Sequence, residues 1–172
     1  LLIMPSDHLI PDNHYFANLI KNIKIDENFW VTFGIKPTSP SEAYGYINVK
    51  TDKIIANDCY YVNKFVEKPN ENQALEMMKD SSFYWNSGIF LAKKEIIINS
   101  INLLAKDIAI SCDELWDNTK IAIDSNEVYF NEIYFSKIRD ISIDYSVMEK
   151  TDNIIMVSFN SIWSDVGSWD TF

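Results

Sequence analysis

Two aspartates near opposite ends of the chain, Asp7 and Asp165, are the side chains best suited to bind a metal ion. Asp7 follows the short apolar run 1–4, and Asp165 lies in the aromatic-rich segment 163–169. Magnesium favours one or two protein carboxylates, with water and phosphate oxygens in its remaining positions. The pattern therefore predicts a two-carboxylate magnesium site. The plainer alternative is that Asp7 only caps the turn into the next helix.

A carboxylate and an ammonium group stand side by side at the end of an expected strand, in Phe-Val-Glu-Lys-Pro at 65–69. Glu67 can accept a hydrogen bond from a ligand hydroxyl. Lys68 can meet a phosphate as a mobile point charge that tolerates a changing phosphate geometry. The alternative is a surface charge pair that binds no ligand.

Two aromatic segments contain residues that suit the recognition of a sugar. In segment 84–90, the amide of Asn86 can both donate and accept hydrogen bonds. In segment 44–46, Gly45 has no side chain, so a ligand can approach the backbone closely. The structural alternative for both segments is a turn packed with core aromatic rings.

Composition limits the classes of partner. The chain has 172 residues, of which 47% are hydrophobic, so we expect one sizeable core in a single domain or part of one. The formal net charge is −10 and the only arginine is Arg139, which argues against nucleic acid because phosphate backbones require clustered cations. An anionic substrate would need a divalent cation and one or two placed lysines to offset the repulsion.

The sequence also indicates a cellular compartment. There is no run of about 18 or more apolar residues, so we expect no membrane span. Residues 1–4 have no basic residues before them and are followed at once by Pro5, which argues against a signal peptide. Cys59 and Cys112 have no second cysteine or histidine at metal-ligand spacing, which favours reduced thiols in a cytoplasmic protein.

Apolar periodicity predicts alternating strands and helices. A strand at 1–4 that is buried on both faces, a helix capped by Asp12 and a strand at 30–35 form the order that usually builds a parallel sheet. A helix at 70–79 should bury Ala74, Leu75 and Met78. The other expected elements are strands at 44–49, 53–56, 60–66, 89–92 and 154–159, and helices at 94–104, 106–116, 126–138 and 142–150.

In their order along the chain, these motifs resemble the successive blocks of bacterial mannose-1-phosphate guanylyltransferases, essentially from residue 1 to residue 172. Each motif alone is a weak signal, and the specific signal is their sequence of occurrence. The blocks are LIMPSDH at 2–8, TFGIKPT at 32–38, YGYI at 44–47, VNKFVEKP at 62–69, WNSGIF at 85–90, SIDYSVMEK at 142–150 and WSDVGSW at 163–169.

The resemblance implies an α/β fold with a Rossmann-like mixed, mostly parallel sheet flanked by helices. It implies that Asp7 and Asp165 coordinate Mg²⁺ and that Lys68 contacts the sugar phosphate, which makes these three residues the catalytic candidates. The implied reaction joins GTP and mannose 1-phosphate into GDP-mannose and releases pyrophosphate. The residues implied to line the sugar pocket are Gly45, Glu67, Asn86, Asp144 and Tyr145.

The sequence departs from the family in one respect. The family has a glycine-rich signature, with an arginine and a proline-lysine pair, that wraps the triphosphate, and no such loop occurs among these residues. We therefore expect 1–172 to be a partial nucleotidyltransferase domain that is inactive alone. It would be a fragment of a longer protein or would act with a separate amino-terminal polypeptide. The loss of a first strand would expose a sheet edge and favour self-association.

Two alternatives stay open at this point. The chain can be a non-catalytic remnant that binds sugar phosphate or a partner. It can also be a nucleotidyltransferase for another hexose 1-phosphate or another nucleotide, because the choice of base depends partly on residues outside the matched motifs.

Overall fold

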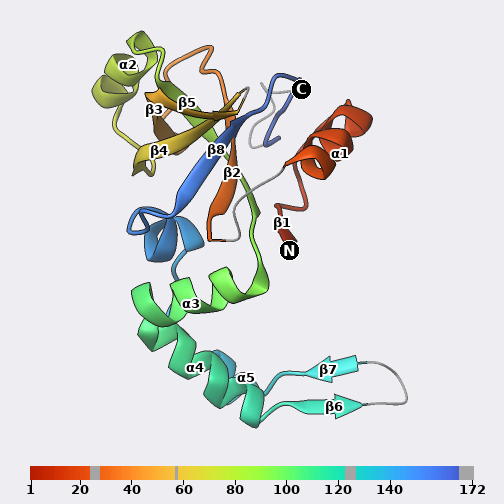
Figure 1. The fold of residues 1–172 in the computed structure, drawn as a ribbon. Coiled ribbons are helices and arrows are strands. Elements are labelled where there is room, and N and C mark those ends of the chain that lie inside the picture. Colours follow the sequence, from red (N-terminus) through yellow and green to blue (C-terminus); the bar gives the residue numbers. More distant parts are fainter. Residues whose placement is uncertain (24–27, 57, 123–126, 167–172) are drawn as a thin grey trace. The chain divides into compact units, whose positions relative to one another are not determined.

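The structure is a computed structural model that describes residues 1–23, 28–56, 58–122 and 127–166. The chain divides into two compact units, one of residues 1–96 and 152–172 and the other of residues 97–151. Figure 1 shows the helices and strands of both units. The expectation that the whole chain is one partial domain stays a prediction.

A mixed six-stranded sheet forms the centre of the first unit, in the order β1-β5-β2-β8-β4-β3. β5 also pairs with β3, so β2, β8, β4, β3 and β5 form a closed circuit of pairings. The strands are β1 (Leu2–Ile3), β2 (Trp30–Ile35), β3 (Tyr46–Ala56), β4 (Cys59–Val66), β5 (Phe83–Leu91) and β8 (Ile154–Ser158).

The mixed α/β class is confirmed, but the expected majority of parallel pairings is wrong for the described strands. Only β2 and β8 pair in parallel, and the other pairings of this sheet in the described part of the chain are antiparallel. β1 and β2 do run in the same direction, as the strand, helix, strand order predicts. They are not neighbours, because β5 lies between them and pairs through Leu91 with both Leu2 and Val31.

The expectation that strand 1–4 is buried on both faces is also wrong. β1 has two residues and pairs with β5 alone among the described strands. Its segment is exposed, with Leu1 at 67% and Met4 at 43% exposure. An apolar strand is buried only where other elements pack on both of its faces. β1 instead pairs along one edge, with β5, and its side chains stay exposed. The exposed edge is the kind of surface on which the predicted self-association would depend.

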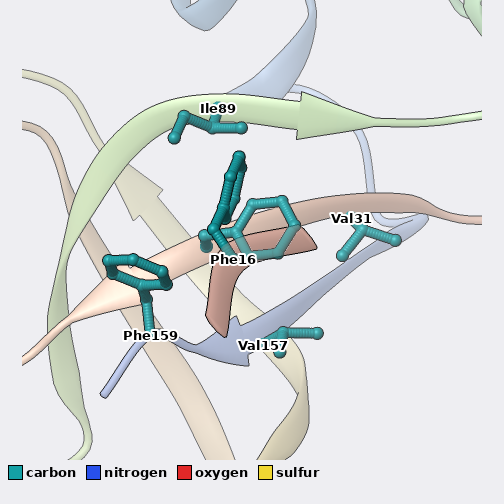
Figure 2. Close-up of a cluster of buried hydrophobic side chains, with 6 residues drawn as sticks. Phe16, Val31, Ile89, Val157 and Phe159 are labelled. Atoms are coloured by element: carbon teal, nitrogen blue, oxygen red, sulfur yellow. The ribbon is translucent and has the colours of Figure 1, made fainter. Parts of the chain in front are cut away.

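Helix α1 (Asn13–Asn22) packs on the sheet through the apolar stripe that the sequence predicts. Asp12 caps it as expected, because its side chain accepts a hydrogen bond of 2.8 Å from the backbone N–H of Tyr15. Phe16 enters a cluster of buried side chains in which its ring meets Phe33 and Phe159. Figure 2 shows Phe16 and Phe159 in this cluster together with Val31, Ile89 and Val157.

The remaining elements of this unit differ from expectation in extent. The expected strands 44–49 and 53–56 are one strand, β3, which forms an antiparallel hairpin with β4. The turn considered as the structural alternative for segment 84–90 is wrong, because this segment lies inside β5. α2 (Glu71–Lys79) buries Ala74, but Leu75 and Met78 are more than a third exposed, so the stripe expected for this helix is wrong.

The second unit consists of helices and one small hairpin. Its elements are α3 (Lys94–Leu104), which begins in the first unit, α4 (Lys106–Asp117), β6 (Lys120–Ala122), β7 (Glu127–Tyr129), α5 (Glu132–Phe135) and the π-helix η1 (Asp144–Met148). Arg139 forms a two-point ion pair with Asp107 of α4, at 2.7 and 3.1 Å. None of the helices in the described residues is long and apolar enough to cross a membrane.

The single helix expected at 126–138 is wrong, although its first residue lies outside the described part. β7 pairs with β6 through Val128 and Tyr129, two residue types that favour strands. Asn131 then caps the short α5, because its side chain accepts the N–H of Ile133 at 3.0 Å. The strand β7 and the new helix cap at Asn131 together explain why one helix does not extend through 126–138.

Attachment of α1 to the sheet should depend on the ring of Phe16. Replacing Phe16 by Ala should lower the free energy of unfolding by about 3 kcal/mol, because a ring in the core is replaced by a cavity. Urea denaturation followed by circular dichroism measures this change. Asn18→Ala, on the exposed side of the same helix, should stay within about 0.5 kcal/mol of the parent. Equal effects of the two substitutions would contradict this packing.

Candidate functional site

Two backbone hydrogen bonds join the segments that contain the predicted metal ligands. The N–H of Leu9 donates to the carbonyl of Ser164 at 2.8 Å, and the N–H of Ser164 donates to the carbonyl of Leu9 at 3.1 Å. This antiparallel bridge places the segment of Asp7 alongside that of Asp165. The side chain of Asp7 is exposed, and that of Asp165 is half-buried.

A second link joins the same two segments through their side chains. The indole N–H of Trp163 donates to Nδ1 of His8 at 3.2 Å, and the two rings meet edge to face at 5.2 Å. Burial lowers the pKa of the His8 imidazole, while the charges of Asp7 and Asp165 act in the opposite direction. Both carboxylates therefore act on one imidazole, although the sequence did not indicate His8 as a site residue.

The block at 85–90 lies against the first of these segments. Gly88 has a φ of +70°, and a β-carbon at this position would contact Pro5 and His8 at 3.7 and 3.8 Å. A left-handed backbone favours glycine, which has no side chain to clash with the carbonyl oxygen. The backbone conformation therefore favours glycine here, while the space beside Pro5 and His8 would accept a β-carbon.

A cavity of about 480 Å³ adjoins Asp165. Three aromatic rings line it, and the ring of Tyr44 packs between the other two, at 4.9 Å from Trp85 and 5.5 Å from Trp163. Hydroxyl groups of the loop after β2 form another part of the wall. The lining residues are Thr38, Ser39, Pro40, Ser41, Ala43, Tyr44, Trp85, Trp163, Ser164 and Asp165.

Tyr44 and Trp85 contribute polar groups as well as rings. The hydroxyl of Tyr44 donates to Oδ1 of Asp165 at 3.0 Å. Burial, together with this hydrogen bond and the charge of Asp165, raises the pKa of Tyr44 to about 12, so the hydroxyl keeps its proton. The indole nitrogen of Trp85 is buried and has no hydrogen-bond partner among the described residues. Such a donor is normally satisfied by water or a ligand.

The structure brings together three of the residues expected to line a sugar pocket. A β-carbon on Gly45 would collide with the carboxylate of Glu67 and would lie 3.4 Å from the side chain of Asn86. The backbone N–H of Asn86 also donates to the carbonyl of Gly45 at 2.8 Å. Gly45 follows Tyr44 and Asn86 follows Trp85, so this trio adjoins two residues of the cavity wall.

The amide of Asn86 is held in place by its oxygen. Oδ1 accepts from the hydroxyl of the fully buried Thr32 at 2.9 Å and from the N–H of Gly88 at 3.2 Å. Thr32 lies opposite Phe90 in the pairing of β2 with β5, which fixes its position relative to Asn86. The core of the sheet thus orients a polar side chain that is itself buried.

Two residues of the candidate site have left-handed backbones without being glycine. Lys68, at the end of β4, has a φ of 43°, and Val166, next to Asp165, has a φ of 53°. For a β-branched residue such as valine this conformation is strained. Within the described residues, Lys68 forms no ion pair with Asp7 or Asp165, and its side chain is exposed. Its contact with a sugar phosphate stays a prediction.

The last two predicted residues lie in the second unit. Asp144 and Tyr145 begin the π-helix η1, in which the N–H of Glu149 donates to the carbonyl of Asp144 at 2.9 Å. A helix was expected at 142–150, and the structure has this shorter, wider turn instead. Such turns are frequent at functional sites. The place of both residues in the sugar pocket stays a prediction.

The family model described as nucleotidyl transferase matches residues 1–172 of this sequence. The chain belongs to the nucleotidyl transferase family. Enzymes of this family act on a nucleoside triphosphate and a sugar phosphate, and they generally use a divalent metal ion. The resemblance noted in the sequence is therefore confirmed at the level of the family.

Individual proteins of known sequence or structure are similar to this chain. A mannose-1-phosphate guanylyltransferase from Salmonella montevideo is 37% identical over 177 residues, which cover 99% of this chain and 37% of that protein. The chain therefore spans little more than a third of the length of that relative. A structure described as mannose-6-phosphate isomerase from Helicobacter pylori superposes with a TM-score of 0.83 at 31% identity, over 95% of this chain and 64% of the other. A structure described as mannose-1-phosphate geranyltransferase from Thermus thermophilus superposes with a TM-score of 0.82 at 27% identity, over 98% of this chain and 47% of the other.

The donor groups of this nucleotidyltransferase chain suit a divalent metal ion, which its family generally uses. No group of three or more His, Cys, Asp or Glu side chains that could hold a metal occurs in the described ranges. Magnesium does not need such a group, because it keeps water ligands and is often held by one or two carboxylates together with substrate phosphate. Asp7 and Asp165 lie on adjoining segments, and Asp165 lines the cavity, so the two carboxylates fit this requirement.

The contact between Gly45 and Glu67 can be tested against a core glycine. In Gly45→Ala the new methyl group meets the far end of the long, flexible Glu67 side chain, so the free energy of unfolding should fall by less than about 1 kcal/mol. In Gly34→Ala the methyl group meets the buried side chains of Met156 and Tyr84, and the loss should reach about 1–3 kcal/mol. Chemical denaturation of both variants provides the comparison. A larger loss in Gly45→Ala than in Gly34→Ala would contradict it.

Proposed function

We propose that this chain forms the metal-binding and sugar-phosphate-binding part of a mannose-1-phosphate guanylyltransferase. The observation that supports this most is the convergence of motif segments from distant parts of the sequence around one cavity. The segment of Asp7 lies beside that of Asp165, and Tyr44 links Asp165 to the glycine that packs against Glu67. The similarity to guanylyltransferases supports GTP and mannose 1-phosphate as the substrates.

In the proposed reaction, a phosphate oxygen of mannose 1-phosphate attacks the α-phosphorus of GTP. A bond forms between that oxygen and the phosphorus, and the bond from the α-phosphorus to the bridging oxygen of pyrophosphate breaks. The products are GDP-mannose and pyrophosphate. This transfer needs alignment of two anionic groups and neutralisation of their charge more than it needs a covalent intermediate.

Asp7 and Asp165 would hold the magnesium ion. Bound between them, the ion would supply positive charge that offsets the repulsion between the two phosphate-bearing substrates. This matters in a chain with a net charge of −10, which would otherwise repel both substrates. Lys68 would add a second positive charge at the sugar phosphate.

The trio of Gly45, Glu67 and Asn86 would recognise the hydroxyl groups of the sugar. Glu67 can accept hydrogen bonds from them, and the absent side chain at Gly45 leaves room for its carboxylate. The amide of Asn86 would contribute to the same recognition, in the orientation that Thr32 and Gly88 give its oxygen.

The metal assignment predicts the effect of removing either carboxylate. In the full-length protein, Asp7→Asn and Asp165→Asn should each lower turnover on the order of 100-fold or more, because the developing charge loses its counter-ion. Release of pyrophosphate from GTP and mannose 1-phosphate, coupled to a colour reaction, measures turnover. Melting temperatures should stay close to that of the parent, because both side chains are at least partly exposed.

Asp152→Asn is the matched control, since it removes one exposed carboxylate from the same unit. It should keep full turnover. Near-parental turnover in Asp7→Asn and Asp165→Asn would remove the metal assignment. A preference for glucose 1-phosphate with UTP or dTTP would favour the alternative of another hexose. Absence of both sugar-phosphate binding and turnover would favour a non-catalytic remnant.

A further inference from the structure

Tyr44 occupies a position between the two halves of the candidate site. Its hydroxyl donates to Oδ1 of Asp165 at 3.0 Å, across most of the length of the sequence. The next residue, Gly45, packs against Glu67 and accepts a backbone hydrogen bond from Asn86. Neither the metal assignment nor the sugar assignment gives a role to the tyrosine itself.

The ring of Tyr44 packs against two other rings. Its centroid lies 4.9 Å from that of Trp85 and 5.5 Å from that of Trp163. Trp163 in turn donates its indole N–H to His8. A tyrosine has few rotatable bonds, so these two ring contacts restrict where its hydroxyl points.

The hydrogen bond from Tyr44 is compatible with cation binding by the same carboxylate. A carboxylate has two oxygens with about four acceptor sites, so the bond from Tyr44 to Oδ1 uses one of them. What it restricts is the rotation of the carboxylate about its last side-chain bond. Groups that orient a metal ligand in this way typically contribute about 10- to 100-fold to metal affinity.

We propose that Tyr44 is a positioning residue for Asp165, which its hydroxyl holds in one orientation for binding a divalent cation. This rests on the proposed function, in which Asp165 is a metal ligand. Tyr44 touches neither the metal nor the reacting atoms in this role. It reduces the entropy that Asp165 would lose when the cation binds, because the carboxylate is already oriented.

The test is the affinity of the full-length protein for Mn²⁺, measured by electron paramagnetic resonance of the free ion. Only the part of Mn²⁺ binding that Asp165→Asn abolishes is counted, because a chain of net charge −10 also attracts cations non-specifically. Tyr44→Phe removes the hydroxyl and keeps the ring, and should raise the dissociation constant about 10-fold. Adding Tyr44→Phe to Asp165→Asn should change nothing further.

Tyr15→Phe is the control, because it removes a hydroxyl that accepts from the N–H of Asn160 at 3.3 Å in the same unit. It should leave the dissociation constant within about 2-fold of the parent, because it does not touch a metal ligand. A matching loss of affinity in Tyr15→Phe would overturn the positioning role in favour of general destabilisation. Melting temperatures of both variants, measured in the absence of metal, separate loss of folding from loss of affinity.

Two results distinguish failure of this proposal from failure of the function on which it rests. If Asp165→Asn loses Mn²⁺ and Tyr44→Phe keeps parental affinity, the positioning role is wrong and the metal site stands. If Asp165→Asn binds Mn²⁺ as the parent does, the metal site of the proposed function is wrong, and the role of Tyr44 falls with it.

Discussion

The hydrogen-bonded bridge between Leu9 and Ser164 is the interaction on which the candidate site depends. Two backbone hydrogen bonds contribute only about 2 kcal/mol and cannot by themselves close a loop that spans most of the chain. The strand pairings of the sheet supply the remaining stabilisation. β5 holds β1 on one edge and β2 on the other, and β2 pairs with β8, so the sheet brings both segments close before the bridge forms.

Around that bridge, aromatic side chains hold polar groups in place. Tyr44 and Trp163 each carry one hydrogen-bond donor that meets a partner from the other end of the chain. Asp165 stays half-buried beside these rings, so its carboxylate accepts from Tyr44 and still borders the cavity.

Sequence patterns predicted the elements whose stability is local, and failed where neighbours decide. The cap and stripe of α1 were correct because Asp12 caps its own helix and the helical period alone places Phe16 on the face that meets the sheet. The burial of 1–4 and the helix at 126–138 were wrong because strand partners determine both outcomes. Motif order indicated Asp7, Asp165 and the sugar trio. It could not indicate the bond from Tyr44 to Asp165, which depends on the register of a bridge between remote segments.

The left-handed backbone at Lys68 has a consequence for attempts to engineer this protein. Glycine would adopt the same conformation at lower cost, so a selection for heat resistance alone would reward replacing the lysine. The variants that such a selection retains would lack the ammonium group of Lys68 and would still be stably folded. If Lys68 contacts the sugar phosphate as proposed, stability and activity compete at position 68, and a mutagenesis campaign should hold it constant.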